Sequence, residues 1–493
     1  MKLQSQTQRV VVAGAGVAGL TAAALLARSG FAVTLLEKNS YPGGRAAQLQ
    51  LDGFRFDLGP TLLFMPDVFR KAFAQCGADF DREVPCTRLD PNYRLHFPGG
   101  RMLEISGSLP QTLESLERFE AGSSAGLLRY LAGAAQAYEL SRRHFVGKRI
   151  RSAFEFLRPA TMGALIRSGA FRSLATTAQR AFKSNDVAAA LSFQSMYLGM
   201  SPFASPELYR LLFFTEMGEG IFFPAGGIGA LVRALESLAV ANGVEIEYGT
   251  PVTGLERNER RITAVLSGTS RFDCDAVVMT ADLPYVYNRL LGEARHRSVR
   301  MQLTPSALLL YVALEERYPD LAHHEFLMPG DLRGVCSDIF ERGVFPRDPA
   351  IYIAAPGATD PSMAPPGKEA LYVLVPAPNL RGGIDWQGQA PSLAQHILAI
   401  VERRRLPGLR SRIRWMRTRT PLDFETELNL HGGAAFGLSH GLTQIGPLRP
   451  DTRHKRYRNL YFAGASTRPA TGLPLVTMSA MQTADRIRED FAA

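Results

Sequence analysis

The sequence predicts an α/β protein in which a Rossmann-type dinucleotide-binding domain is interleaved with a mixed β-sheet domain and a helical, basic region. Three observations support this prediction. They are a glycine-rich βαβ pattern near the amino terminus, several strand-like segments in the middle of the chain, and a strand of small residues followed by a helix at the carboxyl end. With 493 residues, the chain is long enough for two or three domains around a large core.

The amino-terminal pattern contains the three elements of a βαβ unit. Residues 10–12 form a short apolar run that suits a buried strand, and residues 21–29 are rich in alanine and leucine, which favours a helix. Gly30 ends that helix, and residues 33–36 form a second apolar strand. A strand, a helix and a strand in this order and spacing are typical of a unit that binds a dinucleotide.

Three glycines join the first strand to the helix in GxGxxG spacing. Gly14 permits the tight turn, Gly16 lets the backbone approach a pyrophosphate, and Gly19 lets the helix and the strand pack closely. The helix N-terminus offers free N–H groups and a positive dipole end to the phosphates. Glu37 at the end of the second strand suits a ribose hydroxyl and would repel a 2′-phosphate. The pattern therefore argues against NADP and leaves NAD and FAD open.

A second glycine-rich stretch follows Glu37. Gly43, Gly44 and Arg45 suit a second loop that runs along the pyrophosphate and places a cation beside it, and Thr61 follows in a Gly-Pro-Thr turn. The alternative is a surface turn with a solvated arginine.

The carboxyl end carries a second cofactor segment. Residues 459–466, NLYFAGAS, predict a strand that ends in small residues, and Gly464 lets the backbone approach a second phosphate or a ribityl chain. Residues 475–488 predict a helix with Pro474 at its first turn, where the missing N–H costs nothing. The N-terminus of this helix would stabilise negative charge on an electron-rich ring. Because the two cofactor segments lie at opposite ends of the chain, we expect them to form one interleaved domain.

Strand-like segments fill the middle of the chain. Residues 304–315, 351–355 and 371–376 each predict a strand, residues 91–97 resemble an edge strand, and residues 403–419 predict a solvated basic helix and turn. We therefore divide the chain into five segments. Residues 1–110, 241–300 and 441–493 are the first, second and last parts of the FAD-type cofactor domain, residues 111–240 are a helical region that contacts substrate and membrane, and residues 301–440 are a substrate domain.

The stretch from residue 142 to residue 183 is strongly basic. It holds ten lysines or arginines and one acid, Glu155, with large apolar residues such as Phe154 and Phe171 between them. A basic, apolar, helix-compatible segment is typical of a contact with the surface of a membrane, whereas the alternative is a solvated basic face. The net charge of +10 indicates an anionic partner. Because no nucleic-acid motif is present, we expect lipid headgroups, no nucleic acid, and a membrane-facing role for the helical region.

Composition also suggests where the protein works. No stretch approaches about 18 uninterrupted apolar residues, and the first nine residues lack the apolar core of a signal peptide. Cys76, Cys86, Cys274 and Cys336 are scattered without a CxxC motif, which argues for reduced thiols and against a zinc or iron–sulfur centre. We expect a cytoplasmic protein that associates peripherally with a membrane and holds no metal.

With these residues assembled, the chain resembles the FAD-dependent carotenoid desaturases of the amine oxidase superfamily, including bacterial and fungal phytoene desaturases. Besides the amino-terminal pattern, the similar segments include SFQSMYLGMSPF at Ser192, GIFFPAGGIGALV at Gly220, TADLPYVYNRLL at Thr280, TPLDFETELNLHGGAAFGLSHGLTQ at Thr420, LRPDTR at Leu448 and NLYFAGAS at Asn459. These segments occur in the same order and span nearly all of the chain.

The resemblance implies oxidation of a long, lipid-soluble polyisoprenoid. A hydride leaves an allylic carbon for flavin N5 and a proton leaves the neighbouring carbon, which gives a new conjugated double bond, and a quinone or oxygen then takes the electrons. By similarity, the residues expected to contact FAD are Gly14, Gly16, Gly19, Glu37, Lys38, Gly44, Arg45, Thr61, Val252, Gly464 and Pro474, with Val252 acting through its backbone near the adenine.

The sequence departs from the family where the flavin ring is expected. Arg468 stands in place of a histidine, and Leu475 stands in place of a common glycine. These departures leave two alternatives open: a desaturase of a later or shorter carotenoid, and an oxidase of carotenoid end groups.

Glu219 and Arg468 are the candidate catalytic residues. Glu219, or its neighbour Glu216, would take a proton if it were buried, because burial raises the pKa of a carboxyl group. The alternative is that both glutamates cap a helix or face solvent. The pair His323 and His324 is expected to be structural, because no third metal ligand is evident.

Two other classes of protein fit parts of the sequence. An amine oxidase that acts on another substrate would need an aromatic cage beside the flavin, and the sequence shows no such signature. A non-catalytic lipid escort on the same fold predicts loss of the flavin contacts, whereas the glycine pattern is intact.

Overall fold

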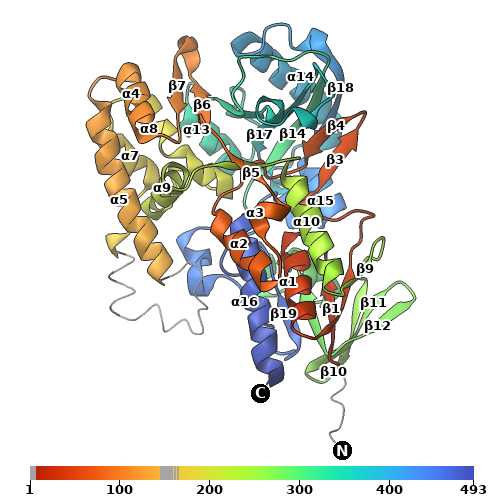
Figure 1. Cartoon of the computed structure of the whole chain (residues 1–493). Helices are drawn as coiled ribbons and strands as arrows, with labels where there is room; N and C mark the ends of the chain where they lie inside the picture. The colour runs from red at the N-terminus through yellow and green to blue at the C-terminus, as the bar shows by residue number, and fades with distance from the viewer. Residues whose placement is uncertain (1–6, 145–158, 160–162, 164–165, 493) are drawn as a thin grey trace, which may run out of the picture.

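The structure is a computed structural model that describes residues 7–144, 159, 163 and 166–492 (Figure 1). The predicted βαβ unit lies at the centre of a five-stranded parallel sheet. Strand β1 (Arg9–Ala13) pairs with β2 (Ala32–Leu36) on one side and with β13 (Ala276–Met279) on the other. The outer strands are β9 (Glu245–Glu247) and β19 (Leu460–Phe462). Segments from both ends of the chain therefore share one sheet.

Helices cover one face of the parallel sheet. Helix α1 (Val17–Arg28) packs between α10 (Ile228–Ala241) and α16 (Leu473–Ala492). Helix α1 begins directly after the glycine turn, four residues earlier than the alanine-rich run suggests, and its first ten residues are all buried. An antiparallel sheet covers the other face; its strands are β10 (Gly254–Asn258), β11 (Arg261–Ser267) and β12 (Ser270–Asp273).

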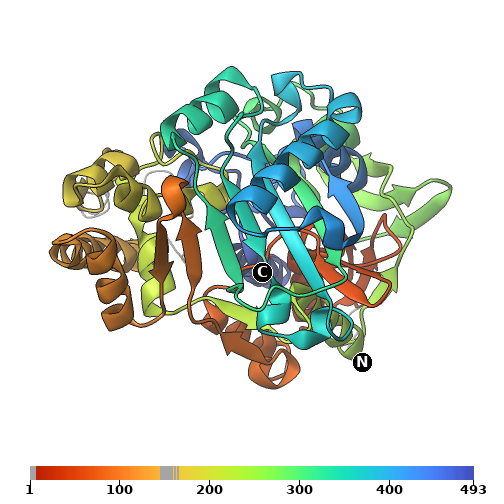
Figure 2. The ribbon, with the colours of Figure 1, turned by 90° about the horizontal axis from the view of Figure 1, so that it is seen from above.

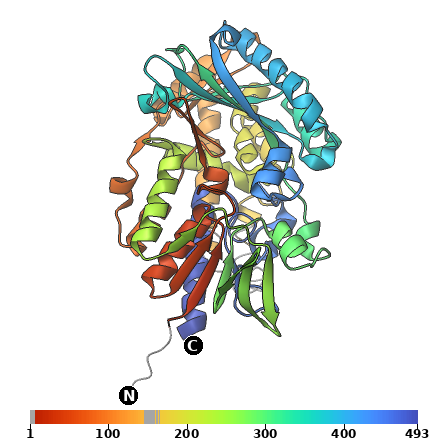
Figure 3. The same cartoon turned by 90° about the vertical axis from the view of Figure 1, so that its right-hand side faces the viewer.

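A second, mixed sheet of seven strands lies above the parallel sheet in the view of Figure 3. Its strands in spatial order are β18 (Ile413–Arg419), β14 (Ser306–Leu314), β17 (Glu369–Ala377), β16 (Ile351–Ala354), β15 (His324–Leu327), β6 (Tyr93–His96) and β7 (Met102–Ile105). All neighbours are antiparallel except β15 and β6.

Two sequence-based expectations for this sheet are wrong. Strand β6 is an inner strand, because β7 pairs outside it and takes the edge. Residues 413–419, which were expected in a basic helix and turn, form the other edge strand, β18. Strand β6 pairs with the distant β15 and with β7, and strand β18 pairs with the distant β14. The local sequence pattern of a strand does not show such partners.

Helices enclose the seven-stranded sheet. Helix α14 (Trp386–Arg404) crosses one face (Figure 2) and buries Trp386, Ile397 and Val401 against it. The helical region beside the other face contains α4 (Leu109–Phe119), α5 (Ser123–His144), α7 (Leu174–Ala181), α8 (Asn185–Ala190) and α9 (Leu211–Gly218). The remaining pieces are β3 (Gln48–Leu51), β4 (Phe54–Asp57), β5 (Cys86–Arg88), β8 (Phe222–Pro224), α2 (Pro66–Gln75), α3 (Phe80–Glu83), α11 (Leu283–Tyr285), α12 (Arg297–Arg300), α13 (Leu332–Ser337) and α15 (Pro421–Leu428).

Much of the basic stretch from residue 142 to residue 183 lies outside the described residues, namely 145–158, 160–162 and 164–165. In the part that is described, Ile166 and Phe171 are 61% and 67% exposed, whereas Leu174 is buried. Within the described ranges, no helix has the length and apolar character needed to cross a membrane.

Candidate active site

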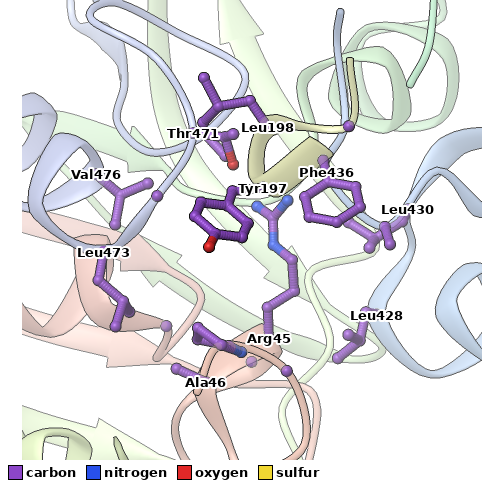
Figure 4. Close-up of a pocket in the computed structure, with 18 of the residues that line it drawn as sticks. Arg45, Ala46, Tyr197, Leu198, Leu428, Leu430, Phe436, Thr471, Leu473 and Val476 are labelled. Atoms are coloured by element: carbon purple, nitrogen blue, oxygen red, sulfur yellow. The ribbon is translucent and has the colours of Figure 1, made fainter. Parts of the chain in front are cut away.

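A large cavity of about 550 Å³ lies between the two sheets. Its walls combine the glycine turn after β1, the end of β2, the loop after β19 with the start of α16, and one face of the seven-stranded sheet. Figure 4 shows the middle of this cavity. Ten of the residues expected to contact FAD line it, namely Gly14, Gly16, Glu37, Lys38, Gly44, Arg45, Thr61, Val252, Gly464 and Pro474.

Gly19, the remaining residue of that set, lies behind the glycine turn. A Cβ atom on Gly19 would lie 1.8 Å from the carbonyl oxygen of Gly14, so the helix touches the turn with bare backbone. Gly14 has a φ of +108°, and a Cβ atom there would lie 2.5 Å from Oγ1 of Thr280. Helix α1 has no side-chain cap and no acid in its first turn. Its first N–H groups and its dipole are therefore available to a phosphate at the cavity wall.

The end of β2 forms the nucleotide end of the cavity. The buried Glu37 carboxylate accepts hydrogen bonds from the backbone N–H of Ala15 at 2.7 Å and of Asn39 at 2.9 Å, which fix its direction. Its remaining lone pairs suit a ribose hydroxyl. The ammonium of Lys38 donates to the Thr426 carbonyl at 3.1 Å, so this residue ties the nucleotide end to α15.

Arg45 extends from the second glycine loop into the cavity, beside Tyr197 and Phe436 (Figure 4). Gly43 anchors this loop by donating to the Ala15 carbonyl at 2.8 Å. Burial lowers the pKa of the Arg45 guanidinium, and the charge of Asp282 opposes that effect. Its Nη1 atom is buried without a hydrogen-bond partner among the described residues. A buried, unpaired donor at a cavity wall fits a ligand that carries acceptors or negative charge.

The loop after β19 brings bare backbone and a helix N-terminus to the cavity. Gly464 has a φ of +110°, and its N–H donates to Oγ of Ser479 at 3.1 Å. Helix α16 starts at Leu473 with no acid in its first turn. Leu473, Pro474 and Val476 face the cavity, so the positive end of this helix dipole points toward a bound ligand.

Arg449 holds this loop in place, a role that the sequence analysis missed. The side chain is 1% exposed and donates to the carbonyls of Thr467 at 2.9 Å and Ala465 at 2.5 Å, and to the Ser439 carbonyl at 3.2 Å. Burial lowers the pKa of Arg449 to about 10, so it remains charged at neutral pH. Arg449 lies in the LRPDTR segment that resembles the family, but the local sequence does not show that its side chain is buried or which carbonyl groups it contacts.

The half of the cavity beyond Arg45 is apolar and aromatic. The seven-stranded sheet contributes Phe326, Tyr352, Tyr372 and Leu374, and other elements contribute Phe64, Phe193, Leu212, Phe340 and Phe424. Hydroxyl groups in this half are turned to protein partners: Tyr372 donates to the Gly59 carbonyl at 3.0 Å, and Tyr352 lies 2.7 Å from Oγ1 of Thr61. Such a surface suits a hydrocarbon ligand.

Neither Glu219 nor Arg468 is among the residues that line the cavity in the described structure. Glu219 is half-buried and accepts a hydrogen bond from the Tyr138 hydroxyl, and the Arg468 guanidinium lies 3.5 Å from the Asp451 carboxylate. Glu216 is fully buried and interacts with Tyr197. Tyr138 and Tyr197 both line the cavity, so each glutamate contacts a cavity-lining tyrosine, and the two glutamates differ in burial.

His324 is the first residue of strand β15 in the seven-stranded sheet, and His323 directly precedes it. His324 Nδ1 lies 2.7 Å from the Tyr352 hydroxyl, and His323 Nδ1 lies 2.7 Å from Oγ1 of Thr359. Burial lowers the pKa of His323 to about 3 and lowers that of His324 as well, so both are neutral and brace neighbouring loops. The described ranges hold no group of three or more potential metal ligands.

Comparison with known proteins extends over nearly the whole chain. A zeta-carotene-forming phytoene desaturase from Myxococcus xanthus is 42% identical over 492 residues, which are 99% of this chain and 95% of that protein. A 4,4′-diapophytoene desaturase (4,4′-diaponeurosporene-forming) from Staphylococcus haemolyticus is 33% identical over 500 residues, covering 98% and 99% of the two chains. The crystal structure of an oxidoreductase from Methanosarcina mazei shares the fold, with a TM-score of 0.67, 16% identity and coverage of 97% and 100%.

The fold and the cavity thus define a flavin-dependent oxidoreductase. The chain belongs to the flavin containing amine oxidoreductase family, whose model matches residues 17–488, and within it to the carotenoid desaturases. The predictions of an FAD cofactor and of an enzyme are confirmed.

Proposed function

We propose that this protein desaturates a carotenoid precursor of the phytoene type and uses FAD as its oxidant. The observation that carries the proposal is the continuity of the cavity, which runs from the glycine turn to a wall of aromatic and aliphatic side chains. Relatives named as phytoene and diapophytoene desaturases align along almost the whole chain and support the same activity. A long apolar substrate would lie along the seven-stranded sheet, with one end close to the start of α16.

The residues of the cavity fit the proposed cofactor. Gly14, Gly16 and the first turn of α1 would hold the pyrophosphate, Glu37 the ribose and the backbone at Val252 the adenine. The bare backbone at Gly464 and the N-terminus of α16 would hold the flavin end, with Arg45 as a cation beside it. When bound, FAD supplies a two-electron acceptor for the hydride of an allylic carbon, and a quinone or oxygen would reoxidise it.

The activity is tested with the purified, flavin-loaded protein and phytoene in phosphatidylcholine vesicles, with a quinone or oxygen as acceptor. We expect products with longer conjugation, separated by chromatography and recognised by absorbance at longer wavelength. Unchanged phytoene, with the flavin bound, contradicts the assignment of this substrate. In that case the same assay with more desaturated carotenoids tests the later-step desaturase and the end-group oxidase.

The proposal includes peripheral contact with a membrane. Exposed Ile166 and Phe171 alternate with Arg167 and Arg172 in the described part of the basic stretch. Apolar side chains that enter the acyl boundary, with cations at the headgroups, are the usual pattern of an interfacial segment. A substrate dissolved in lipid would then enter the cavity near its Tyr138 and Leu212 wall, which belongs to the same helical region.

Replacing both apolar side chains, Ile166→Ser with Phe171→Ser, is expected to weaken binding to vesicles that contain anionic lipid by at least about tenfold, because burying one such side chain contributes about 1.5–3 kcal/mol. Vesicle co-sedimentation measures the effect. The matched control is Val240→Ser with Val344→Ser, which removes two exposed apolar side chains from other parts of the surface. Equal binding by both double variants would contradict the proposed contact.

A further inference from the structure

A buried carboxylate stands directly behind the aromatic half of the cavity. Glu216 on α9 has no exposed surface. The Tyr93 hydroxyl donates to its Oε2 atom at 2.8 Å, and the side-chain amide of Gln194 lies 3.5 Å from the same atom. Its Oε1 atom has no hydrogen-bond partner of normal geometry among the described residues. Tyr93 and Gln194 therefore hold one edge of the carboxylate, and the other edge makes no hydrogen bond of normal geometry with the described residues.

Tyr197 contacts both Glu216 and the cavity. It belongs to the 3-10 helix Phe193–Leu198, lines the cavity and lies beside Arg45 (Figure 4). Its hydroxyl is buried and, like Oε1 of Glu216, lacks a hydrogen bond of normal geometry among the described residues. The two groups nevertheless interact, because the Tyr197 hydroxyl favours the ionised form of Glu216. Two adjacent buried polar groups that make no hydrogen bond of normal geometry within the described part of the chain call for a function.

Among the residues that the structure describes, no cation acts on the charge of Glu216. The groups that face it are the Tyr93 hydroxyl from β6, the Tyr197 hydroxyl and the Gln194 amide from the 3-10 helix, and the Tyr130 hydroxyl from α5. Burial raises the pKa of Glu216 to about 8, and the hydrogen bonds from Tyr93, Tyr197 and Gln194 oppose that rise. A carboxyl group with a pKa near the working pH exchanges a proton readily in both directions.

We propose that Tyr197 and Glu216 accept the proton that the substrate loses during desaturation. This inference rests on the proposed function. A C–H bond breaks beside the carbon that gives up the hydride, and its electron pair becomes the new double bond. The proton binds the Tyr197 oxygen as the hydroxyl proton of Tyr197 passes to Oε1 of Glu216. After the product leaves, the proton returns along the same path to the cavity. Tyr197 is the catalytic residue, and Glu216 acts through it as a positioning residue and proton store.

The pH dependence of the rate tests this proposal. The rate of the wild-type protein should rise with pH up to about pH 8, because the carboxylate must be ionised to accept a proton. Glu216→Gln keeps an acceptor for Tyr93 and removes the titrating group, so the rate should fall about a hundredfold to ten-thousandfold and lose this dependence. Tyr93→Phe removes a hydrogen bond that lowers the pKa of Glu216, so the rise in rate should move to higher pH.

A second readout does not depend on turnover. Infrared titration of the wild-type protein should show a protonated carboxyl band that disappears as the pH rises through about 8, and Glu216→Gln should lack that band. Tyr197→Phe should lower the rate about a hundredfold and keep the band. If Glu216→Gln fails to fold or loses flavin, Tyr197→Phe decides the matter alone.

The outcomes separate the two proposals. An unchanged pH profile in Glu216→Gln, or a full rate in Tyr197→Phe, overturns the proton path while the desaturase activity stands. If Glu219→Gln loses the pH dependence instead, Glu219 is the group that accepts the proton, and the proposed path through Tyr197 and Glu216 is overturned. An inactive wild-type protein with bound flavin and an intact infrared band counts against the proposed function and not against the titration of Glu216.

Discussion

Gly19→Ala is expected to abolish flavin binding, or to raise the dissociation constant for FAD at least about a hundredfold. The new Cβ atom would lie 1.8 Å from the Gly14 carbonyl oxygen and 3.0 Å from the Gly14 carbonyl carbon. Both are backbone atoms of the turn, so no side chain can rotate away. Helix α1 must shift from the turn, at a cost of about 1–3 kcal/mol or more, and its N-terminus then no longer meets the phosphates.

The flavin absorbance of the purified protein and a titration with FAD measure this loss. Gly254→Ala in β10 is the matched control, because its Cβ atom would make an ordinary contact of 3.5 Å with the Leu266 side chain. The control should keep its flavin. Normal FAD affinity in Gly19→Ala would show that the turn and the helix do not form the phosphate site.

Arg449→Met is expected to lower the free energy of unfolding by about 3 kcal/mol and to weaken flavin retention. Methionine fills similar space but leaves the buried carbonyls of Ala465 and Thr467 without their side-chain donor, whereas the Ser439 carbonyl still accepts from the Gln444 amide at 3.3 Å. Each buried acceptor left unpaired costs about 1–3 kcal/mol, and relief from burying a charge offsets part of the total. The loop that carries Gly464 would lose its anchor.

Urea unfolding and flavin content together test this expectation. Arg449→Lys should have an intermediate effect, because one ammonium keeps the charge but cannot reach all three carbonyls. Arg271→Met removes a side chain that is 48% exposed and pairs with Glu256, and this control should change stability by less than about 0.5 kcal/mol. If Arg449→Met behaved like the control, Arg449 would not hold the cofactor loop.

The sequence was most informative where function requires bare backbone. Only glycine suits the three positions that the sequence pattern identified. A Cβ atom on Gly19 would meet backbone atoms, and the positive φ of Gly14 and Gly464 would strain any other residue. The short buried strand at residues 10–12 was also recognised, since consecutive apolar residues before a glycine turn indicate burial on both faces.

Long-range contacts decided the rest. The inner position of β6 and the strand β18 depend on partners that local sequence does not show. The sequence analysis chose Glu219 as the candidate and named Glu216 as its neighbour, whereas the structure buries Glu216 fully and places Glu219, half-buried, beside Tyr138. Arg468 was singled out by comparison with a motif, whereas Arg449, nineteen positions earlier, makes the contacts that shape the loop.

The sequence alone determined the α/β class and the dinucleotide turn, because these depend on residue types that a short backbone motif demands, and its resemblance to the carotenoid desaturases along nearly the whole chain implied the flavin and the family. Only the tertiary structure decided which polar groups reach the cavity, because the side-chain environment of Glu216, Tyr197 and Arg449 is created by elements that are distant in the chain. Burial, and not residue type, gives these three side chains their properties.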